Sequence, residues 1–216
     1  MSGRNTVNDD TLGRTRRSLH GIAELVLAGP QHRASGRIRL RVTPGGFGGV
    51  TTDLRVEGTD LVGPAGRVPL AGTYREVATA AGVDVGAPQD VYSDTTGIDP
   101  DEPIDLDPAA VALVTGWFAL GDAALRAFAA DVGGDAEPVL WPEHFDLAIA
   151  VDEVNYGASA GDAGEPRPYA YVGPWTPREG EFWNAPFGAL RPAEDFPDVD
   201  TLTAFFAEGR RSAAQP

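Results

Sequence analysis

The sequence predicts an α+β fold in which helices pack on an antiparallel sheet. Three observations support this prediction: a nearly all-apolar helical pattern over residues 108–130, short strands separated by Gly and Pro, and the grouping of strands and helices in blocks. Strict alternation of strand and helix would favour a parallel sheet, whereas blocks of strands joined by short turns favour an antiparallel one. We therefore expect a central helix at about 108–130, with an N-terminal and a C-terminal helix packed on the same sheet.

The first part of the chain is expected to supply one helix and one strand. Residues 1–10 are polar and predict a disordered tail, and residues 11–28 carry apolar side chains at helical spacing. Gly29–Pro30 is expected to end this helix, because proline lacks the amide hydrogen that helices need. A strand is predicted at 37–43. The glycine-rich segment 43–49 lacks the Lys–Ser/Thr of a phosphate-binding loop, so we interpret it as a mobile hairpin flap.

The next part of the chain is expected to form a small meander. Extended runs at 50–57, 60–62 and 67–70 are separated by Gly and Pro, which predicts antiparallel pairing. Thr73 is suited to cap a short helix that reaches about residue 82. The segment 84–107 is rich in carboxylates, Pro and Gly, and we expect an irregular, solvated connector there.

The last part of the chain opens with the long helix, which Asp107 is expected to cap. Residues 157–168 offer few apolar anchors and predict a mobile hairpin tip or lid. Asp200 is expected to cap the last helix. The whole organisation is then a single domain over 11–208 with a disordered tail at 209–216. The strands expected after the long helix are 139–141, 145–151, 169–172 and 182–190.

Composition excludes several classes of function. The chain has 216 residues and no cysteine, which excludes disulfides, thiolate metal sites and cysteine nucleophiles. Its formal net charge is −15 and its isoelectric point is about 4.4, so most of its surface would repel a phosphate backbone and we expect no nucleic-acid partner. Arg37, Arg39 and Arg41 alternate with apolar residues, which is typical of the solvent side of a half-buried strand.

The sequence also predicts no membrane partner and a cytoplasmic location. Its longest apolar stretches, such as 109–120, are shorter than the roughly 20 residues that a bilayer requires. The N-terminus is polar and lacks the apolar core of a signal peptide.

The segment 141–156 has the most unusual sequence in the chain, and we predict a small-molecule pocket near it. In a strand over 144–150, His144 and Asp146 would share one face with two alanines, opposite three large apolar side chains. The small side chains on this face leave space beside the strand, which is either filled by a closely packed helix or remains a cavity. His144 could act as a general base or ligand, with Asp146 and Glu143 as orienting carboxylates, so these three are our candidate catalytic residues. The alternative is a His that serves only as a hydrogen-bonding residue at a strand end.

A divalent metal is a second possibility for the same segment. His20 and Glu24 lie four residues apart on the first predicted helix and would therefore share a face. Together with His144 and Asp146 they would form a set suited to zinc, manganese or iron, provided that this helix packs over the strand. Otherwise His20 and Glu24 are an ordinary surface pair.

Polar and aromatic residues near the candidate pocket are expected to bind its ligand. These are Asn155, Tyr156, Trp141 and Trp183. Trp and Tyr beside Pro and Gly breaks often wall ligand sites, although core packing accounts for most buried aromatics. The chain is then either an enzyme or binding protein for a small molecule, or a non-catalytic interaction or self-association domain without metal or substrate.

Four segments carry a resemblance to known sequences. They are Trp-Pro-Glu-His-Phe-Asp-Leu-Ala at 141–148, Asn-Tyr-Gly-Ala-Ser at 155–159, Tyr-Val-Gly-Pro-Trp at 171–175 and Phe-Trp-Asn-Ala-Pro-Phe-Gly-Ala at 182–189. In these segments the chain resembles an actinobacterial protein family of unknown function, and the resemblance covers most of 12–190. It implies a single domain in a bacterial cytosolic setting and carries over no catalytic residue.

Overall fold

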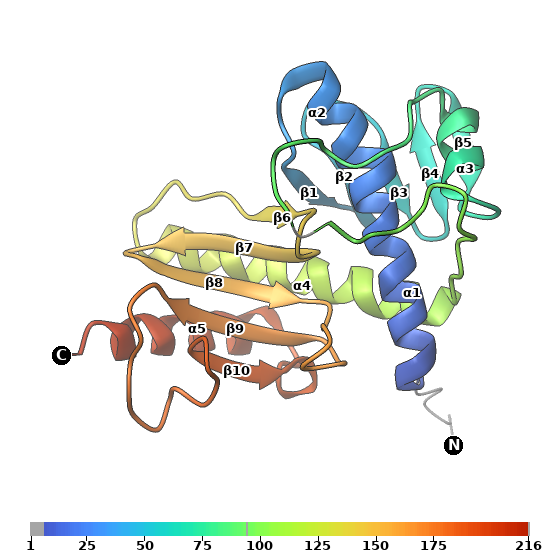
Figure 1. The fold of residues 1–216 in the computed structure, drawn as a ribbon. Coiled ribbons are helices and arrows are strands. Elements are labelled where there is room, and N and C mark those ends of the chain that lie inside the picture. Colours follow the sequence, from blue (N-terminus) through green and yellow to red (C-terminus); the bar gives the residue numbers. More distant parts are fainter. Residues whose placement is uncertain (1–6, 94, 216) are drawn as a thin grey trace.

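A ten-stranded antiparallel sheet runs through the whole molecule, in the order β10-β9-β8-β7-β6-β1-β2-β3-β4-β5 (Figure 1). The computed structural model describes residues 7–93 and 95–215. All strand pairs are antiparallel, which confirms the predicted α+β class. The strands are β1 (Leu40–Thr43), β2 (Gly46–Gly49), β3 (Arg55–Glu57), β4 (Asp60–Gly63), β5 (Gly66–Pro69), β6 (Val139–Trp141), β7 (Asp146–Val151), β8 (Val154–Ser159), β9 (Tyr169–Pro174) and β10 (Ala189–Pro192).

The helices cover one face of this sheet and leave part of the other face open. In Figure 1, α4 and α5 lie behind strands β7–β10, whose near face carries no helix. The helical elements are α1 (Asp9–Gly21), η1 (Ile22–Ala28), α2 (Gly29–Ser35), α3 (Tyr74–Ala81), α4 (Pro108–Asp131), the short 3-10 turn η2 (Ala193–Asp195) and α5 (Val199–Ala213).

Local capping signals place two helices as predicted. The Asp107 side chain accepts from the amides of Ala109 and Ala110, and Pro108 occupies the first turn of α4. The Thr73 and Glu76 side chains form a reciprocal capping box at the start of α3. These caps depend on residues that are neighbours in sequence, which is why the sequence alone could locate them.

The first helix continues past the predicted stop at Gly29–Pro30. Between Ile22 and Ala28 the backbone is π-helical, and the Gly29 amide donates to the carbonyl of Glu24, five residues back. A π-helical segment widens the helix, and Pro30 then sits in the first turn of α2, where its missing amide hydrogen costs least. The helical rod therefore reaches Ser35. It also begins earlier than predicted, since Asn8 caps it and residues 9 and 10 are helical rather than part of a tail.

Two other segments differ from their predictions. The glycine-rich segment contains buried strand β2, and its Phe47 is completely buried in the core, so the flap interpretation is wrong. Gly46 and Gly48 lie so close to β3 that a Cβ atom on either would come within 3.0 Å of its backbone. In the predicted strand 182–190, only Ala189 and Leu190 belong to β10.

The C-terminal end is also helical beyond its predicted limit. Helix α5 is capped by Asp198 rather than Asp200 and continues through Ala213, which places most of the expected tail at 209–216 in a helix. Phe205 and Phe206 of this helix are buried in the core.

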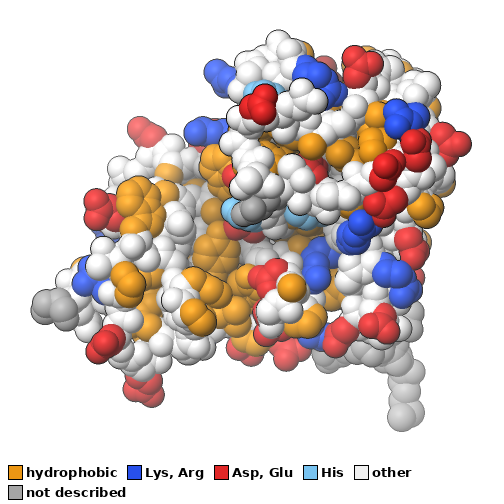
Figure 2. Space-filling view, in the orientation of Figure 1, with side chains coloured by type: hydrophobic (Ala, Val, Ile, Leu, Met, Phe, Trp, Pro, Cys, Tyr) orange, Lys and Arg blue, Asp and Glu red, His pale blue; other side chains and the backbone are white. Residues whose placement is uncertain are grey.

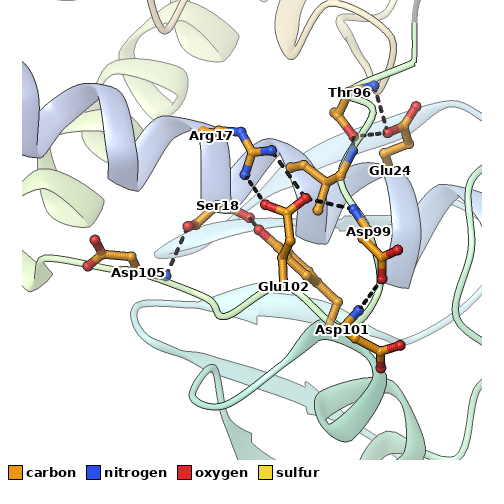
Figure 3. A network of polar contacts seen from close by, with 10 residues as sticks. Arg17, Ser18, Glu24, Thr96, Asp99, Asp101, Glu102 and Asp105 are labelled. Atoms are coloured by element: carbon orange, nitrogen blue, oxygen red, sulfur yellow. Dashed lines mark hydrogen bonds and ion pairs between the residues drawn. The ribbon is translucent and has the colours of Figure 1, made fainter.

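The described part of the connector 84–107 is irregular, as predicted, but several of its residues are attached to α1 and η1 (Figure 3). Arg17 pairs with Glu102 at 2.8 Å, and the Ser18 hydroxyl accepts from the Asp105 amide at 3.0 Å. Further along the helix, the carboxylate of Glu24 accepts from the amide of Thr96 at 3.0 Å. The carboxylates of this segment therefore serve as attachment points, not only as solvated charges.

The loop after β8 is likewise attached to α1. The Arg16 guanidinium donates to the carbonyls of Pro166 and Asp162, and Arg167 pairs with Asp9. Tyr169 donates to Asp162 at 2.6 Å. Residues 157–159 belong to β8, and these contacts hold the remainder of the loop against α1 and β9. Its predicted mobility stays a prediction.

The apolar composition of helix α4 bears on the prediction that the chain has no membrane partner. By length and composition alone it could cross a membrane, with a mean hydropathy of 1.4 over its most apolar window, half of which is buried in the fold. The apolar character of this helix is distributed over its whole length and is not visible in its uninterrupted apolar runs. Gly121 of α4 lies against β8, where a Cβ atom would come within 2.7 Å of the Ala158 Cβ.

Candidate functional site

A hollow on the open face of the sheet contains most of the predicted site residues. It has a volume of about 1040 Å³ and extends from β1 across β6 and β7 to β8. Trp141, Glu143, His144, Asp146 and Asn155 all line it. The predicted strand alternation explains this: Leu147 and Ile149 are buried on the helix side, while Asp146 and Ala148 face the hollow.

Asp146 begins β7 and lies at the centre of this site. Its Oδ2 accepts a short hydrogen bond from the hydroxyl of Tyr171 on β9, and its Oδ1 is buried with no hydrogen-bond partner among the described residues. Burial raises the pKa of the Asp146 carboxyl, and the Tyr171 hydrogen bond opposes this only in part. A buried carboxyl with a raised pKa in a hollow is typical of functional sites.

The contact between Tyr171 and Asp146 spans an intervening strand. Gly157 of β8 pairs with Ala148 on one side and with Tyr171 on the other, and a Cβ atom on Gly157 would lie 2.4 Å from the Tyr171 ring. Only glycine lets the tyrosine ring cross the strand here. Burial beside Asp146 raises the pKa of Tyr171, so its hydroxyl stays protonated and donates to the carboxyl.

Glu143 and His144 lie in the turn between β6 and β7. The Glu143 Oε2 is buried and, among the described residues, has no hydrogen-bond donor. His144 is exposed and lines the hollow beside Asp146. Phe145 adopts a positive φ of 52° in this turn and buries its ring against His20, Phe47 and Phe118. The buried Phe145 ring anchors the turn in which Glu143 and His144 line the hollow.

The predicted four-residue metal site is not formed. His20 does lie under the turn, where its Nε2 is 2.7 Å from the Pro142 carbonyl, and burial lowers its pKa. Glu24 is instead completely buried and accepts hydrogen bonds from Tyr92 and Thr96 of the connector. Within residues 7–93 and 95–215, no group of three or more His, Asp or Glu side chains could hold a metal ion.

An arginine row forms the opposite wall of the hollow. Arg37, Arg39 and Arg41 are exposed there and form no ion pair in the part of the chain that the structure describes. The guanidinium of Arg39 lies 5.5 Å from the centre of the Trp141 ring. Their alternation with apolar residues predicted only the solvent side of a strand. The strand order, which the alternation does not reveal, places them on the same hollow as the carboxylates of Glu143 and Asp146.

An aromatic surface continues the site toward β9. It lines a second hollow of about 610 Å³ that shares His144, Asp146, Asn155 and Tyr171 with the first. Trp175 and Phe187 are 64% and 47% exposed, and the Trp175 indole donates to the Asn155 side chain at 3.2 Å. Figure 2 shows hydrophobic side chains gathered around a recess in the middle of this face, with histidine beside it.

Two predicted ligand-binding residues lie elsewhere. Tyr156 follows Asn155 directly in β8, so its side chain points to the opposite face of the sheet, where it packs on Phe128 of α4. Trp183 packs on Phe182, which in turn contacts Phe205 of α5. Neither lines a hollow that contains His144 or Asp146.

Comparison with known proteins does not assign the chain to a family. No family model, curated protein or solved structure matches the chain. The resemblance to an actinobacterial family therefore stays a prediction, and the function rests on the geometry of the site.

Proposed function

We propose that the hollow between the arginine row and Asp146 binds a small zwitterionic molecule of the amino-acid class. The observation that carries the proposal is the pair of buried carboxylate oxygens, Asp146 Oδ1 and Glu143 Oε2, which have no donor among the described residues. A buried acceptor without a partner costs roughly 1–3 kcal/mol, so a ligand that brings N–H groups to both oxygens gains that energy on binding.

The opposite wall supplies the complementary charge. In an acidic chain with a formal charge of −15, most described arginines pair with carboxylates or backbone carbonyls. Arg39 and Arg41 form no such pair among the described residues, and neither do Arg37 and Arg211. Arg41 belongs to β1 and Asp146 to β7, with only β6 between them. Trp141 of β6, which pairs with Asp146 and lies 5.5 Å from the Arg39 guanidinium, forms the floor between the two walls. Neighbouring strands are about 4.8 Å apart, so the strands that carry the walls are about 10 Å apart. A small molecule with a cationic group at one end and a carboxylate at the other spans this distance across the Trp141 ring.

Each residue then has a defined part in binding. Asp146 and Glu143 accept hydrogen bonds from the cationic group, and Tyr171 holds the Asp146 carboxyl in place. Arg39 and Arg41 receive the carboxylate, for which the guanidinium fork is well shaped. His144 and Asp146 are also the two groups that could exchange a proton with a bound molecule, which would be the basis of any catalysis.

The test uses three related molecules whose binding is followed by calorimetry. L-arginine has both charged ends, agmatine lacks the carboxylate, and L-citrulline has an uncharged ureido group in place of the guanidinium. We expect L-arginine to bind more tightly than the other two. Asp146→Asn should abolish its advantage over citrulline, and Arg39→Gln with Arg41→Gln should abolish its advantage over agmatine.

Two controls accompany this experiment. Asp200→Asn and the double change Arg178→Gln with Arg211→Gln alter the charge by the same amounts outside the hollow and should leave all three affinities unchanged. Equal binding of the three molecules, or loss of binding in the controls, would contradict the proposal.

The exposed aromatic surface supports a second candidate function, protein association through Trp175 and Phe187. Exposed apolar side chains gathered on one face often mark interaction sites. Sedimentation of the wild type and of Trp175→Ser would test it. Self-association that weakens in the variant is expected, and a monomer over all concentrations would argue against self-association.

A further inference from the structure

A separate cavity lies at the far end of the sheet, on the side that carries the helices. It has a volume of about 530 Å³ and is enclosed by the C-terminal ends of α4 and α5 and by the turn between β7 and β8. Figure 1 shows these three segments at the same end of the molecule. Its apolar lining includes Phe128, Val132, Val154, Ala207 and Ala213.

Tyr156 lines this cavity, and its hydroxyl is buried without a hydrogen-bond partner among the described residues. The Tyr156 side chain is completely buried, with its ring 4.6 Å from that of Phe128 and 6.1 Å from that of Phe206. Burial raises its pKa to about 12, so the hydroxyl is protonated at neutral pH. It is therefore a buried hydrogen-bond donor that has no acceptor among the described residues of the free protein.

The charged groups around the cavity cancel one another. Three acidic and three basic side chains line it: Asp131, Asp152, Glu153, Arg178, Arg210 and Arg211. Arg210 pairs with Asp152 at 2.8 Å, and the two side chains are 43% and 62% exposed, which places this pair at the mouth. A ligand with a net charge would gain little from such a balanced rim.

We propose that this cavity binds a neutral, mostly apolar molecule whose carbonyl oxygen accepts a hydrogen bond from Tyr156. The apolar lining holds the body of the ligand, and the buried hydroxyl selects for the oxygen. A site that buries an unpaired donor discriminates against analogues that lack the acceptor, because those leave the donor unsatisfied. The site is independent of the zwitterion site, which lies on the opposite face of the sheet.

The test compares two probes of nearly equal shape. Acetophenone carries a carbonyl oxygen, and α-methylstyrene has a methylene group in its place. In an NMR titration we expect the amide signals of Val132 and Ala207 to shift with either probe, and acetophenone to bind about fivefold more tightly. Tyr156→Phe removes only the hydroxyl and should make the two affinities equal. Ala207→Phe should fill the cavity and abolish binding of both.

The stability of Tyr156→Phe is the second readout. A hydroxyl with no partner contributes nothing to the free protein, so the variant should melt at the same temperature as the wild type or above it. Tyr169→Phe is the control, because its hydroxyl donates to Asp162 and its loss should lower the melting temperature. No shift at Val132 or Ala207, equal affinity of both probes for the wild type, or a clear destabilisation by Tyr156→Phe would each overturn the proposal.

Discussion

At the scale of single residues, the site depends on which face of a strand each side chain occupies. Asn155 and Tyr156 are neighbours in β8 and therefore lie on opposite faces, one in the open hollow and one in the cavity behind the sheet. The strand alternation that correctly predicted the face of Asp146 also places Asn155 and Tyr156 on opposite faces of β8. It could not show that Tyr171 reaches Asp146, because that contact depends on strand order and on the glycine at 157.

The lowered pKa of His20 lets us predict how stability changes with pH. Its folded-state pKa is lowered from 6.5 by burial, so below about pH 6.5 the unfolded chain binds a proton that the native state does not. Stability should therefore fall on acidification below pH 6.5, with a slope of at most about 1.4 kcal/mol per pH unit from this one group. Melting temperatures at pH 7.5 and 5.5 would measure the loss.

Two histidine variants isolate the contribution of His20. His20→Gln keeps an N–H donor for the Pro142 carbonyl but does not titrate, and it should lose less stability on acidification than the wild type. His32→Gln should retain the full loss. The same pH dependence in both variants would show that another group is responsible.

At the scale of elements, the sequence predicted what local signals determine. The caps at Asp107 and Thr73 and the period of α4 involve residues close in sequence, and these helices were located well. The continuation of the first helix through Pro30 and the strand at Gly46–Gly49 were not located, because both depend on packing against distant segments. Glycine suggested a flap at 43–49, whereas its role there is to let two strands approach closely.

The two glycines in the body of α4 provide a matched test of that packing. Gly116 is exposed with open space around it, so Gly116→Ala should stabilise the protein by roughly 0.5–1 kcal/mol through helix propensity. Gly121 touches β8, so Gly121→Ala should destabilise it by about 1–3 kcal/mol despite the same gain in propensity. Chemical denaturation measures both. Similar effects at the two positions would mean that α4 does not pack closely on β8.

At the scale of the whole molecule, the two halves of the sheet meet at β1 and β6 through a single paired position, Leu40 with Leu140. The core nonetheless continues across that junction. The ring of Phe145 contacts those of Phe47 in β2 and Phe118 in α4, with centroids 5.3 and 5.2 Å apart. We therefore expect one cooperative unfolding transition instead of two.

Phe145→Ala tests this cooperation. Loss of a buried ring should cost about 3–5 kcal/mol, and both halves should be destabilised together. Circular dichroism and tryptophan fluorescence should still report the same midpoint, since all four tryptophans lie after residue 116 while the far-ultraviolet signal covers the entire chain. Two separate midpoints would show that the halves unfold independently.

The pKa of Asp146, measured by carbon NMR of its carboxyl group, tests the proposed site most directly. In the free protein the pKa should lie above the usual 3.8, because the carboxyl is buried and one of its oxygens has no donor. L-arginine should lower it, because a cation beside the carboxyl favours the ionised form. A pKa at or below 3.8 that does not respond to L-arginine would contradict the proposal that Asp146 receives the cationic group of a ligand.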